Sequence, residues 1–262
     1  CQTAAGTALL YHVILDPVAE VFAGDVLLKG LQEKVHRDQD KNARETAGVM
    51  LAEVAHCNVW FFNVMGVAWI SIVICLCEGM DARAYRLRSI KDCSVFEVDS
   101  AKVMHFKESI FQAMVEAGEH LPMLEAKSLN RVADIATEDW FNRRKATGFK
   151  AHLPTVWILE GFLYYLQESR ATETLRCISQ NCLNETVMMA DFMNDDWPED
   201  LLSKLRFSRV KVSQIGDPDA NFGLVNDELN LFHQIRRVSR HAKADVNGKP
   251  YRRLLLVESW AP

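Results

Sequence analysis

The stretch from Ile70 to Asp99 constrains the fold of this chain more than any other. It opens with an apolar run, ISIVICLC over residues 70–77, which is rich in β-branched residues and as long as a buried strand. A turn through Gly79 leads into a helix-compatible segment, and a second short apolar run then ends in Glu97-Val98-Asp99. Strand, glycine turn, crossover and second strand predict one unit of a doubly wound α/β sheet.

The glycine and the carboxylates of this stretch suit a nucleoside. A glycine lets the backbone approach a ligand closely, and an acid about 20 residues further on accepts hydrogen bonds from ribose hydroxyls. The chain has no Gly-Lys-Ser/Thr phosphate loop. Four predicted strand ends instead present glycine or carboxylates, namely Gly79, Glu97 with Asp99, Asp134 and Glu160. Acceptors along this edge favour a positively charged ligand with ribose hydroxyls over a triphosphate.

Apolar runs and helix-compatible segments alternate along the rest of the chain, which predicts a mostly parallel sheet covered by helices on both faces. Further strands are expected at residues 129–135, 154–159, 186–190 (followed by Asp191) and 253–258. Helices are expected at residues 137–148 and 169–181, and from an N-cap at Ser100 to Gly118. The apolar face of the helix after Ser100 is predicted to hold Val103, Phe106, Ile110, Met114 and Val115.

The N-terminal part of the chain is expected to be helical. Residues 3–33 carry helical periodicity that Asp16-Pro17 interrupts, and the charged residues 34–46 open a further helix. The sequence contains no internal repeat and no low-complexity linker. We therefore expect a single domain over residues 1–262, with a helical cap over 1–66 and the sheet-bearing core over 67–262.

Composition argues against several classes of protein. The formal net charge of -5 gives no overall attraction to nucleic acid. The seven cysteines form no CxxC pair and several lie in apolar runs, which indicates buried thiols in a reducing compartment rather than a disulfide framework or a metal site. We expect a cytoplasmic protein, with an organelle stroma as the alternative. The first residue is Cys, so a removed targeting segment stays open.

One run is long enough to cross a bilayer. Residues 54–77 contain no Asp, Glu, Lys or Arg, but His56, Asn58, Asn63 and Gly66 interrupt the apolar character. The run also continues directly into the glycine turn. We interpret it as the end of a helix and the first buried strand, with a membrane span as the less favoured alternative.

Four motifs together resemble the leucine carboxyl methyltransferase family: ICLCEGMDARAYRL, VFEVD, VADI and LPTVWILEGFLYYL. The likeness extends from about Thr3 to the last strand and is greatest to the bacterial and plant S-adenosylmethionine-dependent O-methyltransferases. It implies a class I methyltransferase fold, a Rossmann-like, mostly parallel α/β sheet with an antiparallel final strand. It also implies helical additions around an acceptor pocket, and S-adenosyl-L-methionine as the cofactor.

The resemblance implies roles for residues of the first two strands. Gly79 and the turn around it, from Cys77 to Asp81, would lie under the methionine part of the cofactor. Asp99, with Glu97 beside it, would bind the ribose. From the residues alone, these two acids also fit solvated positions that open a helix.

The later motifs are similar to the family's remaining contacts. Asp134 and Ile135 would flank the adenine, although an acid after a strand is also an ordinary helix N-cap. Glu160 would approach the cofactor's amino-acid end. Tyr164 and Tyr165 are candidates for the acceptor pocket, where an aromatic face would stabilise a sulfonium, but their helical spacing also fits a plain core.

The sequence departs from the family's pattern in two places. Glu78 introduces a charge into the turn and would repel the cofactor's carboxylate if it points inward. The upstream helix whose arginine pairs with that carboxylate in the family has no arginine in residues 52–63. Arg83 and Arg86, in contrast, match the family signature, and we expect them to fix the turn by pairing with Asp81 or strand-end carboxylates.

The sequence thus predicts an S-adenosyl-L-methionine-dependent methyltransferase that transfers a methyl group to a carboxylate or hydroxyl oxygen of a small molecule. No nucleophile–base spacing is evident, so no catalytic residue is assigned; this favours a carboxylate acceptor, which needs no base. Two alternatives stay open, a catalytically impaired binding or scaffold protein and a Rossmann dehydrogenase. The single glycine in place of G-x-G-x-x-G counts against the dehydrogenase. No metal, nucleic-acid or membrane partner is expected, and the acceptor and oligomeric state are left open.

Overall fold

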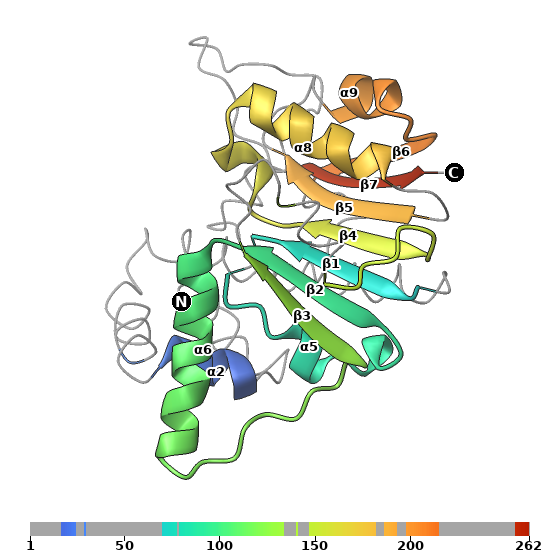
Figure 1. Cartoon of the computed structure of the whole chain (residues 1–262). Coiled ribbons are helices and arrows are strands. Elements are labelled where there is room, and N and C mark those ends of the chain that lie inside the picture. The colour runs from blue at the N-terminus through green and yellow to red at the C-terminus, as the bar shows by residue number, and fades with distance from the viewer. Residues whose placement is uncertain are drawn as a thin grey trace, which may run out of the picture.

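A central seven-stranded sheet organises the computed structural model (Figure 1), which describes residues 17–24, 29, 70–77, 79–133, 140, 147–181, 186–192, 198–214 and 255–261. The strand order is β3-β2-β1-β4-β5-β7-β6. The strands are β1 (Ile72–Leu76), β2 (Ser94–Asp99), β3 (Ser128–Ala133), β4 (Thr155–Leu159), β5 (Thr186–Phe192), β6 (Arg209–Gln214) and β7 (Leu255–Ala261). The described helices are α2 (Pro17–Ala23), α5 (Arg83–Arg86), α6 (Ala101–Glu116), α8 (Glu168–Gln180) and α9 (Pro198–Lys204), with the 3₁₀ helices η1 (Arg88–Ile90) and η2 (Leu163–Tyr165).

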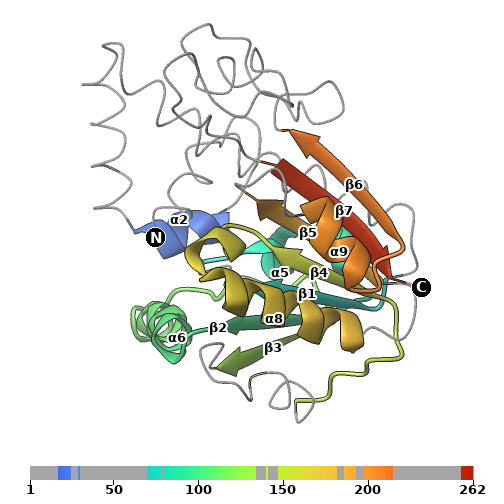
Figure 2. The ribbon, with the colours of Figure 1, turned by 90° about the horizontal axis from the view of Figure 1, so that it is seen from above.

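The directions of the strands confirm the predicted fold class. Strands β1 to β5 pair in parallel, whereas β7 is antiparallel to both β5 and β6. In Figure 2 the arrowheads of β2, β3 and β5 point toward the side on which α2 and α6 lie, and β7 points the opposite way. The carboxyl ends of the parallel strands therefore meet along one edge, where an α/β sheet binds its ligand.

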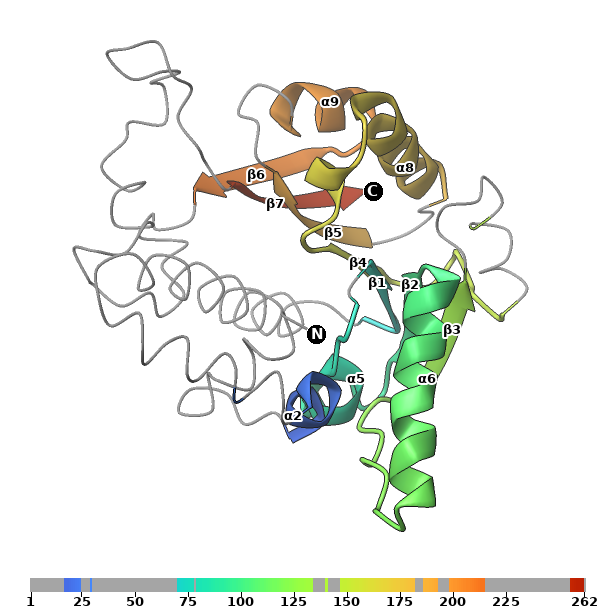
Figure 3. The ribbon, with the colours of Figure 1, turned by 90° about the vertical axis from the view of Figure 1, so that its left-hand side faces the viewer.

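Successive side chains of β1 point to opposite faces of the sheet, and each face has its own buried cluster. Ile72, Ile74 and Leu76 join one buried cluster with residues of α8 and α9, while Val73 and Cys75 join another with residues of α5 and η1. Figure 3 shows α8 and α9 on one side of the sheet and α5 on the other. Helices on both faces explain why β1 is apolar along its whole length, as the sequence predicted.

Helix α6 begins where it was predicted, and the face that it buries overlaps the predicted one in part. Ser100 is the N-cap, with its Oγ accepting from the Val103 amide at 3.4 Å. Met104 and Lys107 are buried, whereas Phe106 and Val115 are 46% and 51% exposed. The predicted face is therefore wrong at Phe106 and Val115.

Contacts with neighbouring elements determine which face of α6 is buried. Its Val103, Ile110 and Phe111 pack against a small cluster around Val18 and Phe22 of α2. Lys107, on the same side of the helix, reaches a carboxylate of β2. Contacts with α2 and with this carboxylate orient the helix, so Val103 and Ile110 of the predicted face pack inward, whereas Phe106 and Val115 do not.

Part of the uncharged run of residues 54–77 lies in β1, since residues 72–76 are buried in the sheet. Within the ranges that the structure describes, no helix is long and apolar enough to cross a membrane. Helix α2 begins at Pro17, at the predicted break. The helix expected to open at residues 34–46 lies outside the described residues, and of the one at residues 137–148 only residues 140, 147 and 148 are described.

Candidate functional site

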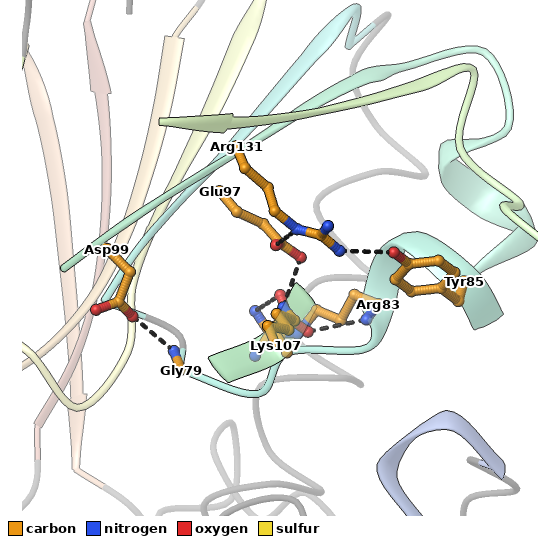
Figure 4. A network of polar contacts seen from close by, with 8 residues as sticks. Gly79, Arg83, Tyr85, Glu97, Asp99, Lys107 and Arg131 are labelled. Atoms are coloured by element: carbon orange, nitrogen blue, oxygen red, sulfur yellow. Dashed lines mark hydrogen bonds and ion pairs between the residues drawn. The ribbon is translucent and has the colours of Figure 1, made fainter. Parts of the chain in front are cut away.

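The turn after β1 is fixed by the carboxylate at the end of β2. The Cys77 amide donates to the carbonyl of Val98 at 2.8 Å, and the Gly79 amide donates to Asp99 Oδ2 at 3.0 Å (Figure 4). Cys77 and Gly79 both have left-handed φ, +58° and +56°. Such φ values favour glycine, so the backbone conformation of the turn, and not crowding, requires Gly79.

Asp99 is held at the junction of β2 and α6. Its Oδ1 accepts from the Ser100 amide at 2.6 Å while Oδ2 accepts from Gly79, and the residue is only 8% exposed. Each carboxylate oxygen has two lone pairs, so Asp99 still has capacity to accept from a ligand. The structure thus presents Asp99 as a rigid acceptor beside the glycine turn, where the sequence expected it.

Glu97 lies in a different environment, among cations. Its Oε1 accepts from Lys107 Nζ at 2.9 Å and its Oε2 from Arg131 Nε at 3.3 Å. Lys107 is 1% exposed and its ammonium lies 5.2 Å from the centroid of the Phe22 ring. The guanidinium of Arg131 also donates to the Tyr85 hydroxyl at 2.8 Å (Figure 4). Both oxygens of Glu97 are therefore already paired within the protein.

This ionic cluster influences Tyr85. Burial raises the pKa of the Tyr85 hydroxyl above its ordinary value of 10.0; the positive charge of Arg131 opposes this rise and the negative charge of Glu97 adds to it. Tyr85 consequently stays a neutral hydroxyl that accepts from Arg131. The cluster joins α5, β2, α6 and β3 behind the glycine turn.

Arg83 connects the turn after β1 with the end of β4. Its backbone amide donates to Asp81 Oδ1 at 2.8 Å, its Nη1 lies 3.6 Å from Asp81 Oδ2, and its Nη2 pairs with Glu160 Oε2. The expectation that Arg83 pairs with Asp81 and a strand-end carboxylate is confirmed. The side chains of Arg83, Asp81 and Glu160 are 10%, 7% and 14% exposed, so these ion pairs are largely shielded from water.

Asp81 is an ionised buried acid. Burial acts to raise the pKa of its carboxyl, but the charges of Arg83, Lys107 and Arg86, together with the amide of Arg83, outweigh it and hold the pKa below 3.8. Asp81 therefore remains a carboxylate at neutral pH and stabilises the guanidinium of Arg83.

A second glycine turn follows β4. Gly161 has a φ of +62°, and its amide donates to both carboxylate oxygens of Asp191, each at 3.0 Å. Asp191 lies near the end of β5 and is 6% exposed. The turns that follow β1 and β4 are thus each anchored by an aspartate of the neighbouring strand.

The structure brings together five of the predicted cofactor residues: Cys77, Gly79, Asp81, Asp99 and Glu160 lie at the carboxyl ends of β1, β2 and β4. Glu97 lies on β2 but faces the cations described above. Glu78, Asp134, Ile135 and the side chain of Tyr164 lie outside the described residues. Tyr165, in η2, is 80% exposed.

Sequence reasoning missed Asp191, Lys107 and Arg131 as residues of this region. Asp191 carried a usable signal, an acid at the end of a predicted strand like Asp99. Lys107 and Arg131 carried none, because a lysine within a helix and an arginine within a strand normally reach solvent. Among the described residues no group of three or more His, Cys, Asp or Glu side chains is arranged to hold a metal ion.

Comparison with known proteins gives a family match. The model of the leucine carboxyl methyltransferase family matches residues 1–179. A protein of Streptomyces coelicolor, provisionally named an S-adenosyl-L-methionine-dependent methyltransferase, is 35% identical over 116 residues, which are 43% of this chain and 35% of that protein. A protein of Mycobacteroides abscessus with the same provisional name is 29% identical over 176 residues, 63% of this chain and 55% of that protein. The chain thus spans between about a third and just over half of these relatives' length.

Among solved structures, a DUF574 family protein from Streptomyces avermitilis aligns with a TM-score of 0.53. The alignment covers 92% of this chain and 96% of that one at 9% sequence identity. A likeness at this identity supports the fold and nothing finer.

Proposed function

Because the chain belongs to the leucine carboxyl methyltransferase family, we propose that it is an S-adenosyl-L-methionine-dependent methyltransferase acting on an oxygen of a small molecule. One observation carries the proposal. A glycine turn held by Asp99 and an ion pair between Arg83 and Glu160 lie together at the carboxyl edge of β1, β2 and β4. This edge is where α/β sheets bind nucleosides.

The residues present fit the cofactor. When bound, S-adenosyl-L-methionine supplies a methyl group on a positively charged sulfur. Asp99 offers a fixed carboxylate for the ribose hydroxyls, and the turn from Cys77 to Asp81 offers backbone for the methionine part. Glu160 offers a carboxylate for the ammonium of the amino-acid end.

We assign the ribose contact to Asp99 rather than to Glu97. Within the part of the chain that the structure describes, Asp99 accepts from the backbone amides of Gly79 and Ser100, whereas each oxygen of Glu97 accepts from a charged side chain. Glu97 then acts behind the site, by fixing β2 against α6 and β3. Asp134 and Ile135, as neighbours of the adenine, stay predictions.

The acceptor is proposed to be a carboxylate, with a hydroxyl as the second choice. An ionised carboxylate attacks without losing a proton, so the protein needs only to align the two reactants and exclude water. Tyr164 and Tyr165, on η2 next to the turn after β4, remain candidates for the acceptor side.

We also propose that residues 1–262 form one domain, with residues 1–66 as a helical cap on the core. The family match runs across residue 66, and β5, β6 and β7 complete the sheet begun by β1. We propose a reducing compartment such as the cytoplasm from the cysteine pattern of the sequence. In the structure the thiol of Cys93 donates to the Ile70 carbonyl at 3.3 Å, and burial, together with the negative charge of Asp92, raises the pKa of this thiol to about 11.

Transfer of a labelled methyl group tests this function. The purified chain is incubated with S-adenosyl-L-methionine carrying a radioactive methyl group and a panel of small carboxylic acids and alcohols, with amines, thiols and carbon nucleophiles as competing acceptors. We expect label in an alkali-labile ester, and loss of the transfer in Asp99→Ala. Label in alkali-stable products alone would exclude a carboxylate acceptor. No transfer to any oxygen, with transfer to nitrogen, carbon or sulfur acceptors, would overturn O-methylation.

A further inference from the structure

Asp191 makes an unusual backbone contact at the edge of the proposed site. Strands β4 and β5 are parallel neighbours in which Leu159 pairs with Ala190, so Asp191 lies beside the residue that follows β4, Glu160. Both oxygens of Asp191 accept from a single amide, that of Gly161, each at 3.0 Å. A carboxylate that is 6% exposed is costly to bury, and hydrogen bonds to the charged group offset this cost.

The contact repeats the one between Asp99 and Gly79. In both, an aspartate near the end of one parallel strand accepts from the amide of a left-handed glycine that follows the neighbouring strand. Glycine moves between φ regions at little cost, so the hydrogen bond and not the residue type fixes each turn. Asp191 therefore does for the turn after β4 what Asp99 does for the turn after β1.

Glu160 is held both through its side chain and through its backbone. Its side chain pairs with Arg83, which Asp81 also contacts, and its own carbonyl belongs to the peptide whose amide Asp191 holds. Loss of the contact with Asp191 would release the ψ angle of Glu160 and the φ angle of Gly161, so the backbone that carries the Glu160 side chain would shift relative to Arg83. The direction of the Glu160 carboxylate thus depends on Asp191, although the two side chains belong to different strands.

We propose that Asp191 is a positioning residue, which fixes Gly161 and thereby aims Glu160 at the amino-acid end of the bound cofactor. The inference rests on the proposed function and extends it to a residue that does not itself contact the cofactor. It predicts a selective defect, because the adenosine end of the ligand would be held by the separate turn of Gly79 and Asp99.

Two ligands that differ at the amino-acid end test this inference. Calorimetric titration compares S-adenosylhomocysteine with 5′-methylthioadenosine, which has the adenosine and sulfur but no amino acid. In Asp191→Ala we expect the affinity for S-adenosylhomocysteine to fall about tenfold, the effect of one lost interaction of about 1.4 kcal/mol, with methylthioadenosine unchanged. Asp191→Asn keeps one acceptor for the Gly161 amide, so it should retain more of the affinity. Asp92→Ala, which removes an exposed carboxylate, is the matched control and should leave the affinity for both ligands unchanged.

The outcomes are distinguishable. An equal loss for both ligands, or no loss for either, in folded Asp191→Ala would overturn the positioning role. If the alanine variant does not fold, Asp191→Asn decides: a loss confined to S-adenosylhomocysteine supports the inference, and unchanged or parallel affinities contradict it. No binding of either ligand by the unsubstituted chain would overturn the proposed function itself, and the inference with it.

Discussion

At the scale of single residues, the buried charged side chains form two sets with different roles. Asp81, Arg83 and Glu160 lie between the turns after β1 and β4, whereas Glu97, Lys107 and Arg131 lie between α6 and the sheet. The first set pairs two carboxylates with one guanidinium, and the second pairs one carboxylate with two cations. In both, a largely buried charge would be strongly destabilising without its partner. The first set faces the proposed ligand, and the second holds the elements that present it.

The ionisation of Asp81 should be visible in the pH dependence of stability. The pKa of Asp81 is held below 3.8 in the folded chain, so its contribution is present above that value and is lost as the pH falls through the folded pKa. We expect the free energy of unfolding to decrease between about pH 6 and about pH 3 by a smaller amount in Asp81→Asn than in the unsubstituted chain. Urea unfolding at several pH values measures this difference. Equal slopes in the two proteins would contradict the assignment.

At this scale, sequence reasoning anticipated the ion pairs of Arg83 because its motif places it two residues after Asp81. It misjudged the surroundings of Glu97, since the partners Lys107 and Arg131 come from α6 and from β3, and no local pattern joins them. The spacing from Gly79 to Asp99 was informative because strand, turn and crossover have limited lengths. Contacts within one β-turn-β unit can thus be predicted from the sequence, whereas contacts that depend on the orientation of a helix cannot.

At the scale of elements, the strands were predictable and the buried face of α6 was predictable only in part. β1 and β4 are buried on both faces and read as continuous apolar runs, which is a strong signal. Phe106 and Val115 of helix α6 were predicted to share a core face with Val103 and Ile110, although the nine residues between them place the two on opposite sides of the helix. The ion pair of Lys107 and the packing of Phe111 on Phe22 at 5.2 Å between ring centroids favour another orientation.

Two substitutions in α6 test the observed orientation. Met104 is 7% exposed, so Met104→Ala should lower the free energy of unfolding by about 2 kcal/mol through lost packing. Phe106→Ala removes a larger side chain that is exposed, and should cost less than about 1 kcal/mol. Chemical denaturation gives both values. The reverse order would contradict the observed orientation of α6, because it would place Phe106 and not Met104 in the core.

At the scale of the molecule, the order of strands creates the site. Because β1 lies at the centre of β3-β2-β1-β4-β5, its turn is flanked by β2 on one side and β4 on the other. The alternation of strands and helices indicated a parallel sheet, but local patterns do not specify which strands are neighbours. The antiparallel last strand was expected from the family resemblance, and β7 confirms it.

The most direct test of the central claim is calorimetric titration of the chain with S-adenosyl-L-methionine and S-adenosylhomocysteine. We predict binding of both with dissociation constants of about 1–100 µM, and at least about tenfold weaker binding in Asp99→Ala, which loses a charged acceptor for the ribose. Asp92→Ala, an exposed acid in the turn before β2, should bind like the unsubstituted chain. No binding at millimolar ligand by a protein that circular dichroism shows to be folded would contradict the account.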